Sequence, residues 1–71
     1  MAIVKVWRNR IWAGTQKLSA CPAKYRSGVI AMMQNDLEDG THTINELATL
    51  VDNGMMTPEE YEEISGEPYA A

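Results

Sequence analysis

Few side chains in this sequence could support catalysis: one histidine, one cysteine and ten carboxylates. His42 lies between Thr41 and Thr43, and Cys21 directly precedes Pro22. A cysteine and a histidine act as nucleophile and base only if the fold brings them together with an orienting group. The simpler interpretation is a solvated histidine in a turn and a small buried thiol. We therefore predict that the protein is not an enzyme.

The same residue types also limit metals and cofactors. A single cysteine excludes an intrachain disulfide, and one His with one Cys almost excludes a structural zinc site. No glycine-rich phosphate loop is present. Four glutamates stand near the start of a predicted helix, where the macrodipole favours negative charge, so we interpret them as a solvated face; they are Glu59, Glu60, Glu62 and Glu63. We predict no cofactor, no metal and no small-molecule substrate.

The aromatic residues near the N-terminus are the stronger candidates for binding. Trp7 and Trp12 flank Arg8 and Arg10. A tryptophan beside an arginine is typical of an interface anchor, and basic helices with tryptophan also lie on membrane surfaces. Three interpretations remain open: packing within the core or an oligomer, docking on another protein, or contact with a membrane or nucleic acid.

These side chains must be positioned by helices, because the apolar residues follow a helical period. In the basic, Trp-containing segment 1–14, Val4, Trp7 and Ile11 share one helix face, and Gly14 stands where a left-handed C-cap is wanted. A strand over residues 3–7 is the competing interpretation, because β-branched residues are dense there. We prefer a helix.

A long helix is predicted over residues 22–39, with Pro22 in its first turn and Gly40 after its end. We read residues 15–21 as a loop. Gly28 weakens the long helix but permits close approach of another helix. The apolar stripe of this helix is formed by Tyr25, Val29, Met32, Met33 and Leu37.

An internal repeat defines the rest of the chain. Residues 40–47 and 54–61 both read as a glycine, two connecting residues, then Thr-x-x-Glu and an apolar residue. Thr-x-x-Glu is a capping box, in which threonine and glutamate satisfy the first free amides of a helix. The repeat predicts two short helices in a hairpin over residues 43–66, followed by a tail at 67–71. The predicted fold class is therefore an all-α bundle of about four helices in one domain, 1–71.

Size and charge point to contact with a partner. A chain of 71 residues buries little surface, and without a disulfide or metal its remaining source of added stability is oligomerisation. The ten acidic residues all lie from Asp36 onward, and the basic ones lie in the first 26 positions: Lys5, Arg8, Arg10, Lys17, Lys24 and Arg26. We expect the two halves to pack against each other, within one chain or between neighbours.

Other partners fit the sequence less well. The basic half could serve a small regulatory protein that binds nucleic acid, but the net charge of −4 opposes this. No apolar run approaches the length needed to span a membrane, and no export signal precedes the first helix. One free cysteine and no export signal are typical of a protein kept in a reducing cytoplasm.

The C-terminal segment, residues 53–69, resembles the ending of XkdX-family phage proteins, which follows a Gly-x-Ile-Thr-x-Glu-Glu-Tyr-x-x-Ile-Thr-Gly-x-x-Tyr pattern. Met56 replaces the usual isoleucine and Ser65 the usual threonine. Residues 9–15 and 22–26 also resemble longer members of the family. The residues at matching positions of the C-terminal pattern are Thr57, Glu60, Tyr61, Ile64, Gly66 and Tyr69.

The resemblance implies a protein encoded in the tail and fibre region of a phage genome. We therefore predict a non-enzymatic structural or assembly protein of the tail or tail fibre that acts through protein–protein contacts. Its expected partners are a second copy of itself or a tail or fibre protein, met in the host cytoplasm during assembly or in the virion tail. The predicted contact residues are Trp7, Arg8, Ile11, Trp12, Tyr61 and Tyr69.

Overall fold

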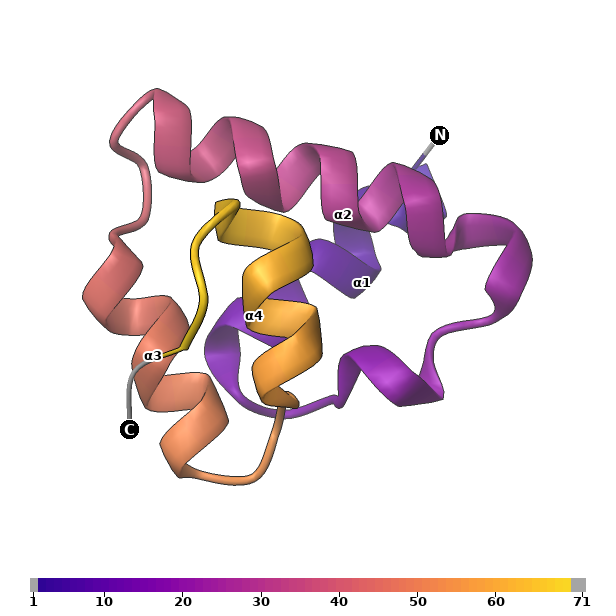
Figure 1. Ribbon diagram of the computed structural model, residues 1–71. Helices are drawn as coiled ribbons and strands as arrows, with labels where there is room; N and C mark the ends of the chain where they lie inside the picture. The colour runs from indigo at the N-terminus through magenta and orange to yellow at the C-terminus, as the bar shows by residue number, and fades with distance from the viewer. Residues whose placement is uncertain (1, 70–71) are drawn as a thin grey trace.

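A computed structural model describes residues 2–69, and this part of the chain is helical with short connections. The prediction of an all-α fold is confirmed, and the strand considered for residues 3–7 is wrong because a helix covers them. Figure 1 shows the elements in chain order, with a short 3-10 turn at Leu18–Ala20 after the first helix. The α-helices are α1 (Ala2–Ala13), α2 (Ala23–Glu38), α3 (Ile44–Asp52) and α4 (Pro58–Ser65).

The helices enclose one apolar core. α1 packs on α2 and touches α3, while α4 packs on both α2 and α3. In Figure 1, α4 stands in front and α1 passes behind α2, so the two lie on opposite sides of the molecule. The buried apolar residues come from every element: Ile11, Leu18, Cys21, Val29, Ile30, Met33, Leu47, Leu50, Met56, Tyr61 and Ile64.

Gly28 sets how closely α1 and α2 approach. A Cβ atom at this position would lie 3.3 Å from Cγ1 of Val4, which is tighter than ordinary van der Waals contact. The prediction that Gly28 permits a close helix approach is confirmed. Val4 is β-branched and has little rotamer freedom in a helix, so it cannot easily move aside.

The predicted stripe of α2 is only partly the buried face. Val29 and Met33 are buried, but Tyr25, Met32 and Leu37 are half-buried, and Ile30 is buried in addition. A single period-3.6 stripe assumes one neighbour, whereas α2 faces both α1 and α4. Two neighbours widen the buried arc of the helix.

The connection before α2 is more ordered than a loop. Leu18 is fully buried within the 3-10 turn, and Cys21 is 7% exposed. Pro22 occupies the N-cap with an extended ψ of 139°, so the helix begins at Ala23 and the predicted place of Pro22 in the first turn is wrong by one residue. Burial of Leu18 anchors this connection to the core.

Both predicted capping boxes are present. At α3, the Glu46 amide donates to Thr43 Oγ1 at 3.3 Å, and the Thr43 amide donates to Glu46 Oε1 at 3.2 Å. At α4, the Glu60 amide donates to Thr57 Oγ1 at 3.1 Å, and the return bond to Glu60 Oε1 is 2.9 Å. Each copy of the internal repeat therefore marks the start of one helix.

The turn between α3 and α4 requires a glycine. Gly54 has φ of +76°, a left-handed conformation that side chains with Cβ rarely adopt. Its amide donates to the Val51 carbonyl at 3.0 Å, and the Met55 amide donates to the Leu50 carbonyl at 2.9 Å. This pair of bonds is a Schellman motif, which ends α3 and leaves two residues before the next cap.

The α4 cap gives a direct test of the repeat. Thr57→Ala removes the acceptor of the Glu60 amide, and we expect a loss of about 1 kcal/mol in the free energy of unfolding. Thr57→Ser keeps the hydroxyl and should stay within a few tenths of the wild type, roughly 0.3 kcal/mol. Urea denaturation followed by circular dichroism measures both variants. Equal stability of the alanine and serine variants would contradict the capping role.

Candidate functional site

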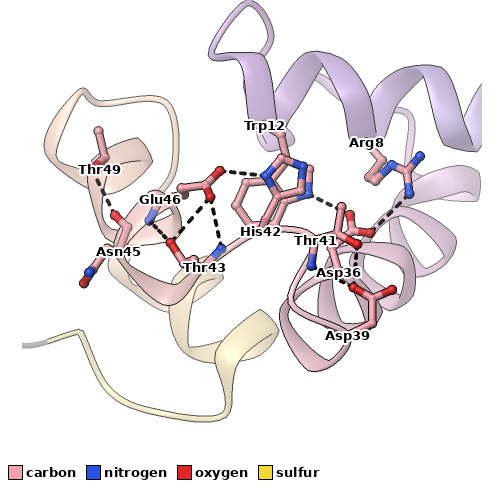
Figure 2. A network of polar contacts seen from close by, with 10 residues as sticks. All are labelled: Arg8, Trp12, Asp36, Asp39, Thr41, His42, Thr43, Asn45, Glu46 and Thr49. Atoms are coloured by element: carbon pink, nitrogen blue, oxygen red, sulfur yellow. Dashed lines mark hydrogen bonds and ion pairs between the residues drawn. The ribbon is translucent and has the colours of Figure 1, made fainter.

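The most distinctive polar feature of the molecule is a buried carboxylate in α2. Asp36 is only 3% exposed. Trp12 Nε1 donates to Asp36 Oδ2 at 2.9 Å, and Arg8 Nη1 lies 3.3 Å from Asp36 Oδ1 (Figure 2). Arg8 and Trp12 are four residues apart, hence on one face of α1. The carboxylate therefore joins α2 to α1 through two donors.

His42 extends this cluster toward α3. Its ring stacks on Trp12 with 4.2 Å between ring centroids and 10° between the planes. Its Nδ1 lies 2.6 Å from Glu46 Oε2, and its backbone amide donates to the Asp36 carbonyl at 3.1 Å. Figure 2 shows the imidazole overlapping the indole in this view, with a dashed line that joins the His42 ring to Glu46. The predicted solvated histidine is wrong, because the ring is half-buried and held on two sides.

The charges of the cluster are fixed by hydrogen bonds. The bond with His42 is the main cause that lowers the pKa of Glu46 below its usual range. Two hydrogen bonds from Thr41 similarly lower the pKa of Asp39 at the end of α2. These carboxyl groups are ionised acceptors at neutral pH. Throughout residues 2–69, every buried side-chain polar atom has a hydrogen-bond partner. The arrangement of the cluster serves to join α1, α2 and α3.

An open depression of about 250 Å³ lies beside this cluster, between the end of α1 and α3. It combines an aromatic side chain, one carboxylate and small polar groups. Within the described range, no group of three or more His, Cys, Asp or Glu side chains is placed to hold a metal ion. The lining residues are Trp12, Ala13, Gly14, Glu46, Thr49, Leu50 and Asn53.

Cys21 lies in the core rather than at this cluster. Burial raises the pKa of its thiol, an effect that the charge of Arg26 opposes. A raised pKa reduces the thiolate fraction, and the thiolate is the nucleophilic form. The prediction of a small buried thiol is confirmed.

The structure separates the six predicted contact residues. Ile11 is fully buried and Tyr61 is 8% exposed, so both are corrected to core residues whose apolar surface is already covered by this chain. Arg8 and Trp12 belong to the Asp36 cluster. Trp7 packs partly buried against the core. A helix face predicted from spacing alone could not distinguish the side that faces α2 from the side that faces solvent.

Tyr69, the last predicted contact residue, is tied to the hairpin. Its ring meets Tyr61 edge to face at 5.2 Å, and its hydroxyl donates to Asp52 Oδ1 at the end of α3. That hydrogen bond raises the pKa of Tyr69. The described part of the predicted tail, residues 67–69, thus folds back on α3 and α4. Residues 70–71 lie outside the described range.

Two ion pairs join the basic and acidic halves within the chain, as expected. Besides Arg8 and Asp36, the Arg26 guanidinium binds both carboxylate oxygens of Glu63, at 3.0 and 2.7 Å. This bidentate pair lowers the pKa of Glu63. It connects α2 to α4.

These observations define a small all-helical protein whose polar side chains hold the helices together. Residues 37–69 match the model of a family described as "Phage uncharacterised protein (Phage_XkdX)". The predicted resemblance is confirmed over this range, which belongs to the XkdX family of phage proteins. The match begins at the end of α2 and includes α3, α4 and Tyr69. No curated protein and no solved structure matches the chain.

The Asp36 cluster predicts a large effect of a single substitution. Asp36→Ala leaves Trp12 Nε1 without its partner in a half-buried site, and we expect a loss of about 2–3 kcal/mol in the free energy of unfolding. Glu38→Ala, two residues later on the exposed side of α2, is the control and should change stability by less than about 0.5 kcal/mol. Similar losses in chemical denaturation of the two variants would contradict the assignment.

The lowered pKa values of Glu46 and Glu63 predict acid sensitivity. A carboxylate with a lowered folded-state pKa contributes stability above its unfolded pKa of about 4.3, and loses it as the pH falls through the folded value. The melting temperature should therefore fall as the pH is lowered from about 5 to about 3. Glu46→Gln and Glu63→Gln should each flatten this fall. Glu62→Gln, at an exposed position of α4, should leave the slope unchanged.

Proposed function

We propose that this protein is a non-enzymatic structural or assembly component of the phage tail or tail-fibre region, acting through protein–protein contacts. The observation that carries the proposal is the match of residues 37–69 to a phage family. The resemblance of its C-terminal pattern to tail-region proteins supports the finer part of the proposal, the location in the tail. On this proposal the protein acts in the host cytoplasm during assembly and stays in the tail.

Contact rather than catalysis is supported by how the candidate groups are used. The His42 imidazole is engaged by Trp12 and Glu46, and the Cys21 thiol is buried with a raised pKa. A general base or nucleophile must reach a substrate atom. In this protein the same groups fix helix positions, which favours a rigid module that presents its outer surfaces.

The alternative that the basic half binds nucleic acid loses part of its support. Arg8 and Arg26 form ion pairs inside the chain, so they do not add to a continuous positive surface. None of the helices in residues 2–69 has the length and apolarity to cross a membrane. Gel shifts with DNA at low salt and flotation with anionic liposomes measure these alternatives directly, and we expect neither to show binding.

Disruption of the coding sequence in its phage tests the proposal. We expect fewer infectious particles and tails that are missing, short or without fibres in electron micrographs. Lysis timing should not change. Mass spectrometry of purified wild-type particles should detect the protein. Intact tails with normal infectivity and altered lysis timing would contradict the tail assignment and favour a lysis role.

A further inference from the structure

Several exposed charged residues on α1 and α4 form no ion pair within the described part of the chain. In residues 2–69, Arg8 and Arg26 are the lysine or arginine side chains with an ion pair. Two of the others, Lys5 and Arg10, are exposed on α1. The exposed carboxylates on α4 that have no ion pair are Glu59 and Glu62, because Glu63 binds Arg26.

The outer face of α1 is apolar as well as basic. Ile3 and Val6 are the exposed large hydrophobic residues of the described chain, at 40% and 41%. With Arg10 they follow i, i+3, i+7 spacing, which places them along one side of the helix. Ile11 marks the opposite, buried side. Lys5 is exposed at the other edge of the solvent-facing arc of α1, and we call this whole arc, with Ile3, Lys5, Val6 and Arg10, the α1 face.

The outer face of α4 carries the opposite charge. Glu60, Tyr61 and Ile64 are buried, so the helix turns the side with Glu59 and Glu62 to solvent. The exposed ring of Pro58 and the methylene groups of the glutamates supply apolar surface there. We call the surface formed by Pro58, Glu59 and Glu62 the α4 face.

No ion pair joins the α1 face to the α4 face of the same copy in residues 2–69. α1 and α4 pack on α2 from different sides, and Figure 1 shows α4 in front of the molecule with α1 behind it. One copy therefore does not pair its own α1 face with its own α4 face. A second copy can do so, because it brings an α4 face without any change of fold.

We infer that the α1 face of one copy docks on the α4 face of a second copy, so that copies associate head to tail. The occupant is a second copy because its α4 face offers carboxylates that its own chain leaves without an ion pair, opposite in charge to Lys5 and Arg10. An α1-to-α1 dimer would place Lys5 and Arg10 against the same residues of the partner, and an α4-to-α4 dimer would oppose glutamates. The inference rests on the proposed contact function and names the partner.

A head-to-tail contact repeats. Each copy that binds leaves one free α1 face and one free α4 face at the ends of the assembly, so the product is a ring or an open filament. Exposed ion pairs contribute little individually, and the apolar strip is small, so the contact is weak and depends on concentration. Such a contact forms where many copies are gathered at one assembly site.

Sedimentation velocity over a concentration series tests the inference. We expect the mass to rise from 7.9 kDa toward multiples of it. Association should weaken as NaCl is raised from about 0.1 M to about 1 M, because the Debye length falls from about 10 Å to about 3 Å. A mass that stays at 7.9 kDa at every concentration would overturn the inference.

Charge reversal identifies the two faces. Lys5→Glu with Arg10→Glu makes both faces acidic, and Glu59→Lys with Glu62→Lys makes both basic. Each double variant should associate at least about tenfold more weakly than the wild type. An equimolar mixture of the two variants should associate again, as should the fourfold variant. Loss of association in the α1 variant alone, without loss in the α4 variant, would overturn the head-to-tail pairing.

The control variant makes the same change in net charge as the α1 variant, but at residues outside α1. Lys17→Glu with Lys24→Glu alters the net charge equally but lies outside α1, so association should stay within about twofold of the wild type. Circular dichroism must show wild-type helicity in every variant, and the mixture provides rescue independent of the fold of either variant. If self-association fails while the protein remains a tail component, this inference is wrong and the proposed function stands.

Discussion

The fold depends on one buried carboxylate. An ionised Asp36 in the interior would be strongly disfavoured without partners. Its partners, Trp12 and Arg8, come from the same face of α1, so satisfying the charge fixes where α1 crosses α2. The indole that donates to Asp36 also stacks on His42, which precedes α3. One charge thus couples the positions of three helices in a chain with no disulfide available to it.

A few specific interactions also stabilise the C-terminal half. A helix of eight or nine residues is not stable alone in water, since nucleation is costly and few bonds repay it. Here each short helix begins at a capping box, and α3 ends in a Schellman motif. Tyr69 then returns to Tyr61 and Asp52, closing the hairpin. The segment matched by the phage family is this locally determined unit together with the end of α2.

Side chains that are buried or hydrogen-bonded within the protein are not available on its surface for a partner. Arg8, Trp12 and Tyr61 were predicted as contact residues. In the structure, Arg8 and Trp12 bind Asp36 and Tyr61 is buried in the core. Ile3 and Val6 were not among the predicted contact residues, yet they are exposed on the same helix as Lys5 and Arg10. The solvent-exposed side of α1 is therefore different from the side that carries the predicted contact residues.

The sequence by itself determined the helices, their caps and the family, because these depend on neighbours within a few residues. Thr-x-x-Glu, a following apolar residue and a glycine with positive φ are local signals, and all appear where the repeat placed them. Only the tertiary structure decided the partners of Asp36, the stacking of Trp12 on His42 and the exposure of Ile3. Those contacts join residues about 25 or more positions apart or depend on which face meets α2. Helical periodicity leaves that choice of neighbour open, since it specifies an apolar face without naming what covers it.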